Sequence, residues 1–585
     1  MPKPTRLHWG IFLVATGAAV LHYCAALARE QTPNLGNLLV HVVTPINSEK
    51  ILPDTFPLPG KRSTTISLQA CRGEYEPASF VVRTGAEGVT GLLPVVTDLI
   101  SATGNRIPKE NIDIKLVKIW YQSGGAWEKV QKIDKLGPVL VPELLINDPD
   151  LVRVDMPGKT NSLKLTAPNG SIRYQDISSP NSGIHKDVPV SVLDMPIKDS
   201  ERLLPTELPR DTTQQYWLTI LAPKDAPSDI YHGSIHLTSK GGAIGNLNIQ
   251  VHVHPFELAK PSLEYSIYYR GFISPDGQPS ISSEEKSRSQ LRRELIDMRE
   301  HGISNPTVLQ RYFGKNDHKL QLLKDYLEIR KQLGFEYLPL YYLGRPTYNP
   351  TEKEKLEDLA SNVREIIQES TRTKNTEVYV YGLDEAKDDK LLSQKPAWAA
   401  VHSVGGKIFT SGYAGHFEKM GKETDLLIYY GPPSREEAAK VHSVGNRIFS
   451  YANPQGGVEN PFIYRKNFGI VLWRSGFDGA MTYAYQDTDG FIWNDFDQAS
   501  PYRDHVFAYP TREGVIDTIA WEGFREAVDD VRYISTLQQR LREPDASEKP
   551  GFKSAKTYLE NLKEREPDDL DDMRTLLASY INSLQ

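Results

Sequence analysis

The sequence contains very little cysteine. Only Cys24 and Cys71 occur among 585 residues, and Cys24 lies inside an apolar segment near the N-terminus. Removal of that segment would leave Cys71 alone, which excludes an internal disulfide and a cysteine-rich metal site. The stability of the chain must therefore come from buried apolar surface, and its length is sufficient for two or three domains.

Clusters of basic residues and glycine-rich nucleotide loops are also missing. The chain has 68 Lys and Arg against 75 Asp and Glu, a net charge of −7, and the basic residues are scattered. This distribution excludes the electrostatic footprint of a nucleic-acid-binding protein. His252 and His254 share one face of a predicted strand, but solvent-facing histidines are far commoner there than metal ligands. We predict no nucleic-acid partner, no metal and no cofactor.

Tyrosine and tryptophan, by contrast, are plentiful. The chain has 29 Tyr and eight Trp, and flat rings with a polar tip suit binding surfaces that are half apolar and half wet. Together with the modest net charge, these rings favour a neutral ligand.

The first thirty residues have the layout of a secretory signal. Lys3 and Arg6 precede an apolar segment that ends in small residues, with a cleavage site near Ala28. An uncleaved membrane anchor is the alternative, although His22 within the segment argues against permanent residence in lipid. We predict a signal peptide over residues 1–28, a secreted or periplasmic protein, and no integral membrane role.

Residues 40–258 have the pattern of a β-sandwich domain. In the segment NLNIQVHVHPFEL, Leu247, Ile249, Val251 and Val253 alternate with polar residues, which is the period of a half-buried strand. No convincing long helix interrupts this region, so we predict a β-sandwich.

Near residue 260 the pattern changes to strands that alternate with amphipathic helices. Eight strands with intervening helices are typical of a (β/α)₈ barrel of the TIM type. An open doubly wound sheet is the alternative, but the chain lacks the glycine-rich loop that would support it. We predict a barrel over residues 262–540, followed by a helical tail over 541–585. The predicted strands are residues 265–272, 302–309, 335–343, 377–383, 406–413, 425–431, 446–453 and 479–486.

Two short segments of the predicted barrel repeat each other. VHSVGGKIF at 401–409 and VHSVGNRIF at 441–449 share seven of nine residues. Each has the pattern of a helix end, a glycine cap and the next strand. The repeat indicates either a duplicated barrel unit or a coincidence of similar helix ends, and it makes His402 and His442 cap or surface residues.

The ends of the predicted strands are rich in rings and amides. Functional side chains of a barrel lie where strands end and loops begin, and rings with neutral hydrogen-bonding groups suit a sugar. Tyrosines also end barrel strands without any binding role, but their joint occurrence favours a carbohydrate ligand. The predicted substrate-binding residues are Arg270, Tyr342, Tyr429, Tyr451, Tyr483, Tyr485 and Trp493.

One acidic pair stands among these rings. The segment EVYVYGLDEAKDD places Asp384 and Glu385 directly after the fourth predicted strand. Like charges held this close repel, so such a pair is either exposed and idle or positioned for proton chemistry. The strand-end position favours chemistry, and we predict Asp384 and Glu385 as the catalytic residues.

Besides the strand that is followed by DE, three further segments carry a resemblance to a known family. They are LQACRGEYEPASFVV, VPELLINDPDLVRVD and WEGFREAVDDVRYI. Together the four resemble glycoside hydrolase family 123, the β-N-acetylgalactosaminidase family, and its uncharacterised secreted relatives. The resemblance covers most of the mature chain, but only the acidic pair bears on chemistry. The last segment has apolar residues at helical spacing and is best interpreted as a structural helix.

The resemblance implies a retaining hydrolase of terminal N-acetylhexosamines that has no enzyme nucleophile. The substrate's own 2-acetamido oxygen would attack the anomeric carbon, with a glycan or oligosaccharide as substrate. Glu385 would protonate the leaving oxygen and later deprotonate water. Asp384 would hold the acetamide N–H and stabilise the positive oxazolinium.

Two other functions remain open. A glycosidase for sugars without an acetamido group could use Glu385 as the acid and Asp487, Asp489 or Asp495 as the nucleophile. A noncatalytic carbohydrate-binding protein could keep the acidic pair as a purely structural feature.

Overall fold

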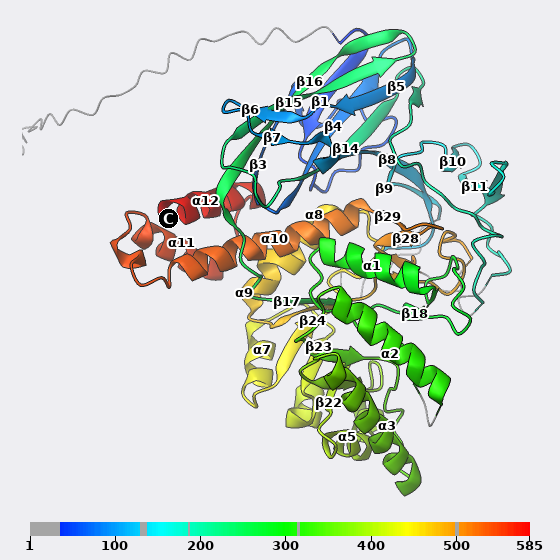
Figure 1. Ribbon diagram of the computed structural model, residues 1–585, viewed down its shortest axis with the longest axis vertical. Coiled ribbons are helices and arrows are strands. Elements are labelled where there is room, and N and C mark those ends of the chain that lie inside the picture. The colour runs from blue at the N-terminus through cyan, green and yellow to red at the C-terminus, as the bar shows by residue number, and fades with distance from the viewer. Residues whose placement is uncertain (1–34, 129–136, 185–187, 313–315, 498–501) are drawn as a thin grey trace, which may run out of the picture. The chain divides into compact units, whose positions relative to one another are not determined.

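The computed structural model describes residues 35–128, 137–184, 188–312, 316–497 and 502–585. The predicted signal peptide lies outside the described residues. Leu35–Gln585 form one compact unit, and Figure 1 labels many of its elements. None of the described helices has the length and apolar character needed to cross a membrane.

The first part of the described chain is built almost entirely of strands in two larger sheets and one smaller sheet. One sheet has the order β2 (Lys61–Arg62), β1 (Leu38–Val43), β4 (Tyr75–Thr84), β14 (Thr213–Leu221), β8 (Ile112–Gln122) and β9 (Val139–Ile146). The other has the order β13 (Thr206–Leu208), β5 (Val89–Val96), β15 (Ile230–Ser239), β16 (Gly242–Glu257) and β3 (Thr65–Arg72), with β6 (Leu99–Ser101) and β7 (Arg106–Ile107) beside β15. The small sheet contains β10 (Val152–Asp155), β11 (Thr160–Thr166) and β12 (Ile172–Asp176).

The apolar residues that alternate along the predicted strands form the core between these sheets. Leu247, Ile249, Val251 and Val253 of β16 are all buried in one apolar cluster shared with the other sheet. Between β1 and β16 the described residues contain only one helical turn, at Lys109–Asn111. Two sheets packed through alternating apolar residues are the arrangement that the sequence predicted.

The second part is a curled parallel sheet. Its seven strands follow the order β17 (Glu264–Ile267), β25 (Gly479–Thr482), β24 (Arg447–Ser450), β23 (Leu426–Tyr429), β22 (Lys407–Gly412), β21 (Val378–Tyr381) and β20 (Leu340–Tyr342). All six pairings are parallel. Seven of the eight predicted strands are therefore present. The six from β20 to β25 each lie beside their neighbour in the chain, and the first strand, β17, pairs with the last, β25.

The remaining predicted strand, 302–309, is irregular in the structure. It nevertheless contacts both edges of the sheet, because Ser304 N–H donates to Tyr265 O of β17 at 2.8 Å and Val308 N–H donates to Tyr341 O of β20 at 2.8 Å. Only an isolated parallel bridge between Val308 and Tyr342 is formed. Pro306 lacks an N–H group and interrupts a regular ladder here.

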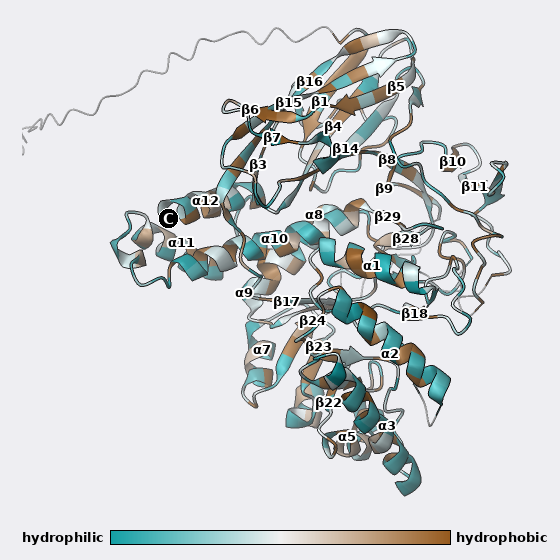
Figure 2. Cartoon of the chain, viewed as in Figure 1, coloured by the Kyte–Doolittle hydropathy of each residue, from teal (hydrophilic) through white to brown (hydrophobic). Residues whose placement is uncertain are grey.

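Helices connect the strands of the parallel sheet, and short strand pairs lie in its loops. The helices are α1 (Arg288–Glu300), α2 (Asp317–Gln332), α3 (Lys353–Arg372), α4 (Asp388–Leu392), α5 (Lys395–His402), α6 (His416–Met420), α7 (Arg435–His442), α8 (Pro461–Lys466), α9 (Leu472–Ser475) and α10 (Ile519–Arg540). The short pairs are β18 (Phe272–Ile273) with β19 (Glu285–Lys286), β26 (Gln486–Asp487) with β27 (His505–Val506), and β28 (Ala508–Pro510) with β29 (Val515–Asp517). Figure 2 shows hydrophobic and hydrophilic residues together on α1 and α10, as an amphipathic helix requires.

The repeated segments occupy equivalent positions. Each ends a helix, α5 or α7, and leads into β22 or β24. His402 Nε2 contacts Asp425 at 2.8 Å and His442 Nε2 contacts Asp478 at 3.0 Å. The prediction of cap or surface roles for the two histidines agrees with these contacts.

The predicted tail forms two helices, α11 (Phe552–Glu564) and α12 (Leu570–Ser583). They pack in an apolar cluster with α10 and the end of β16. Arg574 of α12 is nearly buried and forms ion pairs with Asp530 at 2.7 Å, Glu526 at 2.6 Å and Glu76 at 3.2 Å. The tail therefore joins α10 to the sandwich through charge as well as apolar contact.

We predict that Arg574→Ala lowers the free energy of unfolding by about 3 to 5 kcal/mol, because it leaves buried carboxylates without their cation. Arg565→Ala is the matched control, since the Arg565–Asp568 pair is exposed and should have little effect. Urea denaturation followed by tryptophan fluorescence measures both. Equal midpoints for the two variants would contradict a stabilising role of the buried network.

Candidate active site

Asp384 and Glu385 lie in the turn that leaves β21. The turn is anchored by the next strand and by the residue before α5: Thr410 Oγ1 donates to Leu383 O at 3.1 Å, and Leu383 N–H donates to buried Gln394 Oε1 at 2.6 Å. Gly382 is required for this close approach, because a Cβ there would lie 2.9 Å from the Thr410 side chain. The acidic pair therefore stands at the carboxyl end of the sheet.

The backbone at Glu385 is strained. Its φ is +47°, in the left-handed region that costs a non-glycine residue about 1 kcal/mol. Its N–H donates to Ser411 Oγ of β22 at 3.0 Å. A residue whose strained backbone is held in place by its neighbours is typical of functional sites rather than of strand ends without a function.

Two tyrosine hydroxyls hold the Glu385 carboxylate. Tyr413 donates to Oε2 and Tyr451 donates to Oε1. Burial, together with the hydrogen bond and charge of Glu385, raises the pKa of both phenols well above the usual range. The two tyrosines therefore stay protonated and act as donors throughout the physiological pH range.

The Asp384 carboxylate is more exposed and is held on one side only. Tyr381 O–H donates to Oδ1 at 2.6 Å, and the Ser411 hydroxyl donates to the same oxygen. No hydrogen bond to Oδ2 is found among the described residues. One oxygen of Asp384 is thus fixed, and the other remains available to an N–H group of a ligand.

Aromatic rings extend from the pair across the inner face of the sheet. Tyr430 packs between Tyr413 and Tyr451, with ring centroids 5.0 and 5.6 Å away. Tyr268 donates to the Tyr381 hydroxyl at 3.2 Å and packs against Tyr483 at 5.4 Å. These rings surround the acidic pair with surfaces on which a sugar can stack.

One ring near the site comes from the sandwich. Trp127 follows β8 and packs edge-on against Tyr430 at 6.3 Å and against Tyr502 at 5.7 Å. Its Nε1 is buried and has no hydrogen-bond partner among the described residues. Sequence reasoning missed Trp127 because it lies in a sandwich loop, and its only signal is a tryptophan after two glycines in SGGAW.

Three of the predicted binding residues lie on this side of the sheet. Tyr451 contacts Glu385 directly. Tyr483 donates to Asp487 Oδ2 at 2.5 Å, and Arg270 pairs with Asp487 Oδ1 at 3.0 Å. Arg270 also pairs with Glu284. Tyr483, Asp487 and Arg270 therefore form a connected polar group, and the Tyr483 ring packs against Tyr268.

The other four predicted binding residues lie elsewhere, which corrects the expected ring of contacts. Tyr342 and Tyr429 belong to the cluster between the sheet and its helices, where Tyr342 O–H donates to Gln310 O. Strand side chains alternate between faces, so their chain neighbours Tyr341 and Tyr430 face the interior instead.

Tyr485 and Trp493 are also packing residues. The Tyr485 hydroxyl donates to Asp297 Oδ2 at 2.7 Å, and its ring packs against Trp521. Trp493 lies in the sandwich core, where its Nε1 donates to Pro510 O at 2.8 Å. Its loop turns away from the sheet, which no sequence pattern indicated.

Two of the three carboxylates of the alternative two-carboxylate mechanism are held by neighbouring groups. Asp487 is paired with Arg270. Asp495 is buried and accepts from the backbone N–H groups of Ser123 and Asp504. Asp489 is exposed.

Comparison with known proteins bears on the fold. No family model and no curated protein matches the chain. A family 123 glycoside hydrolase from Clostridium perfringens, which hydrolyses glycolipid glycans, has a similar structure. The match has a TM-score of 0.61 and 12% sequence identity, and it covers 94% of this chain and 98% of that enzyme. The chain shares its fold with this enzyme. The predicted resemblance to family 123 is confirmed at the level of three-dimensional structure.

Other glycoside hydrolases match less well. A β-glucuronidase from Ruminococcus gnavus has a TM-score of 0.30 and 10% identity, covering 77% of this chain and 88% of its own. A family 39 glycoside hydrolase from Bacteroides cellulosilyticus has a TM-score of 0.29 and 12% identity, covering 56% of this chain and 75% of its own. Similarity at this level carries no argument about this chain.

Removing the hydroxyl of a packing tyrosine should destabilise the protein more than removing that of a tyrosine in the candidate site. We predict that Tyr485→Phe lowers the free energy of unfolding by about 1 to 3 kcal/mol, because buried Asp297 loses a donor. Tyr451→Phe removes a hydroxyl from half-exposed Glu385, which water can replace, and should cost less than about 1 kcal/mol. Thermal denaturation of both variants tests this, and a larger loss for Tyr451→Phe would contradict its assignment to an open site.

Proposed function

We propose that this protein is an exported glycoside hydrolase that releases a terminal N-acetylhexosamine by a substrate-assisted, retaining mechanism. The observation that carries the proposal is the pair Asp384 and Glu385, fixed side by side at a strand end by Tyr381, Ser411 and two further tyrosines. The shared fold with a family 123 glycoside hydrolase supports it. Export rests on the N-terminal sequence alone.

We also interpret the curled sheet as a closed (β/α)₈ barrel with 304–308 as its irregular strand. The hydrogen bonds from this segment to β17 and to β20 support that interpretation. In such a barrel the acidic pair lies at the face where substrates bind.

Glu385 is the general acid and base of the proposed reaction. It protonates the glycosidic oxygen as the aglycone leaves, and the resulting carboxylate then takes a proton from the attacking water. Tyr413 and Tyr451 fix both of its oxygens, so the carboxyl group is positioned before substrate arrives.

Asp384 acts on the acetamido group of the same sugar. Its available Oδ2 accepts the acetamide N–H, which turns the carbonyl oxygen toward the anomeric carbon. Ionised Asp384 then stabilises the oxazolinium that forms. Adjacency of the two carboxylates follows, because they serve neighbouring atoms of one substrate.

The alternative with a separate nucleophile is less well supported. Asp487 is held by Arg270 and by the Tyr483 hydroxyl, and a nucleophile needs an oxygen directed at the anomeric carbon. The substrate-assisted reaction needs no such residue.

Hydrolysis of nitrophenyl glycosides tests the proposal. We expect turnover of a β-N-acetylhexosaminide, inhibition by a thiazoline analogue of the oxazolinium, and loss of turnover in Glu385→Gln. Tyr342→Phe is the control, because it removes a hydroxyl from the layer behind the sheet. Turnover only of sugars without an acetamido group would favour the two-carboxylate mechanism, and no turnover of any glycoside would favour a binding protein.

The roles within the pair should separate kinetically. Glu385→Ala should cripple substrates with poor leaving groups, spare an activated aryl glycoside, and recover partly with azide. Asp384→Asn should slow both substrates alike, by about 3 kcal/mol or roughly a hundredfold in kcat, because it loses the charge that stabilises the oxazolinium. Equal sensitivity of the two variants to leaving-group pKa would show that the roles are assigned wrongly.

A further inference from the structure

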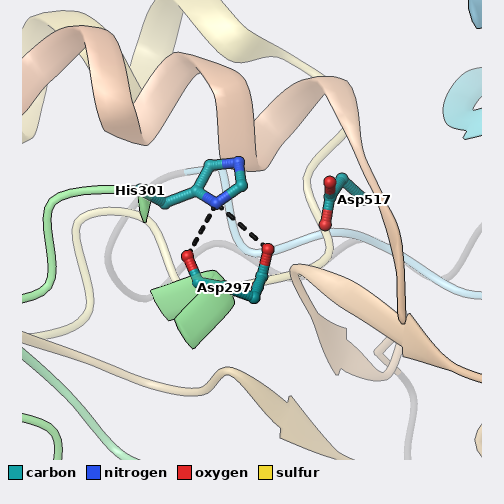
Figure 3. A group of neighbouring side chains, drawn as sticks. All are labelled: Asp297, His301 and Asp517. Atoms are coloured by element: carbon teal, nitrogen blue, oxygen red, sulfur yellow. Dashed lines mark hydrogen bonds and ion pairs between the residues drawn. The ribbon is translucent and has the colours of Figure 1, made fainter. Parts of the chain in front are cut away.

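A second group of ionisable side chains lies outside the candidate active site. Asp297 and His301 are one helical turn apart at the end of α1, and Asp517 ends β29 just before α10. Their ligand-type atoms all lie within 4.8 Å of one another, and no other group in the described ranges meets this criterion. Figure 3 shows the three side chains converging, with His301 Nδ1 directed at Asp297.

The spacing within the group suits a small divalent ion. His301 Nδ1 lies 3.2 Å from Asp297 Oδ1, close to the edge of the polyhedron around an ion with bonds of about 2.1 Å. Two ligands of such an ion are at most about 4.2 Å apart. The three ligand-type atoms lie within 4.8 Å of one another, so any two of them need to close by at most about 0.6 Å to lie on opposite sides of such an ion.

Neighbouring groups orient these side chains as they do around metal sites. His301 Nε2 faces Glu522 Oε1 at 3.4 Å, and its ring stacks on Trp521 with centroids 4.8 Å apart. The second oxygen of Asp297 is occupied by Tyr485 O–H at 2.7 Å and Trp521 Nε1–H at 3.1 Å. A carboxylate behind the distal ring nitrogen and donors on the outer carboxylate oxygen are typical of protein metal centres.

An independent observation on Asp517 also favours a bound cation. Asp517 Oδ1 is fully enclosed, yet it has no hydrogen-bond partner among the described residues. A buried carboxylate oxygen without a partner is costly, and coordination of a cation removes that cost. The nearby cations are already engaged: Arg525 pairs with Glu522 at 2.5 Å, and Lys115 pairs with Asp113 at 3.2 Å.

The group borders a cavity of about 390 Å³ whose wall includes sandwich residues such as Lys115 and Thr219. The cavity has room for water molecules that complete a coordination sphere. Glu522 also accepts from Trp217 Nε1 of β14 at 3.1 Å. An ion here would therefore join α1 to the start of α10, at the place where α10 contacts the sandwich.

We propose that Asp297, His301 and Asp517 bind a structural divalent transition-metal ion. One imidazole nitrogen and two carboxylate oxygens suit Zn²⁺ or Mn²⁺ better than Ca²⁺ or Mg²⁺, which prefer oxygen ligands alone. Coordination replaces water ligands of the hydrated ion with one metal–nitrogen and two metal–oxygen bonds, and the displaced water returns to solvent. It releases to solvent the Nδ1 proton that now faces Asp297 O at 3.0 Å, and Nε2–H continues to donate to Glu522.

The competing arrangement is a protonated His301 that simply bridges Asp297 and Glu522. Two measurements distinguish the metal-bound arrangement from this one. The full chain is first treated with a chelator, and it is then titrated with ZnCl₂ or MnCl₂ in a calorimeter and examined by thermal denaturation. We expect one ion per chain, a rise in melting temperature, and an affinity at least about tenfold weaker in Asp517→Asn and His301→Gln.

Two control variants make this titration specific. Glu110 lines the same cavity without belonging to the ligand group, so Glu110→Gln is the first control. His252→Gln is the second, because it removes the neighbouring ring of His254, the other candidate for adventitious binding. Neither should change the affinity. Absence of stoichiometric binding in the wild type, or equal binding by Asp517→Asn, would overturn the proposal.

A measurement on the wild-type chain covers the case in which a ligand variant fails to fold. Crystals soaked in ZnCl₂ should show an anomalous difference peak between the three side chains. A peak only near His252 and His254, or none, would overturn the proposal. Because this readout does not involve hydrolysis, it stands or fails separately from the proposed enzymatic function.

Discussion

The hydroxyl group of Ser411 fixes the Asp384 carboxylate and the backbone of Glu385 at once. It accepts the backbone N–H of Glu385 and donates to Asp384 Oδ1. Ser411 belongs to β22, so the parallel pairing of β21 with β22 brings it to the turn after β21. The hydrogen-bonded sheet thereby determines the geometry of the pair. The left-handed conformation of Glu385 persists because the neighbouring strand supplies this contact.

Alternation of side chains along the strands decides which rings take part. Tyr341, Tyr379, Phe409, Ile428 and Phe449 fill the inner face of the curled sheet, and the residues beside them pack against the helices. The inner cluster of rings supports the tyrosines that hold Glu385. Trp127 adds a ring from the sandwich, so the candidate site is assembled from both parts of the compact unit.

Helix α10 connects these parts. Its Trp521 and Phe524 pack behind the sheet. Its Glu522 accepts a hydrogen bond from Trp217 of the sandwich. Its Asp530 is buried and forms ion pairs with Arg465 and Arg574. The acidic residues of this helix are therefore not a solvent-exposed face. All four of them are buried and form ion pairs with arginines, which explains how so charged a helix can lie in the interior.

Sequence alone determined the period-two strands of the sandwich, the change of pattern near residue 260, seven strands of the parallel sheet and the position of Asp384 and Glu385 at a strand end. Those features depend on local periodicity and on the order of elements along the chain. Only the tertiary structure decided which tyrosines face the pair, because a shift of one residue in a strand end moves a side chain to the other face. It also decided the contribution of Trp127, the burial of Trp493 in the sandwich, and the meeting of Asp297, His301 and Asp517. Each of these contacts joins segments that are distant in the chain and are brought together by packing between elements, which no local pattern encodes.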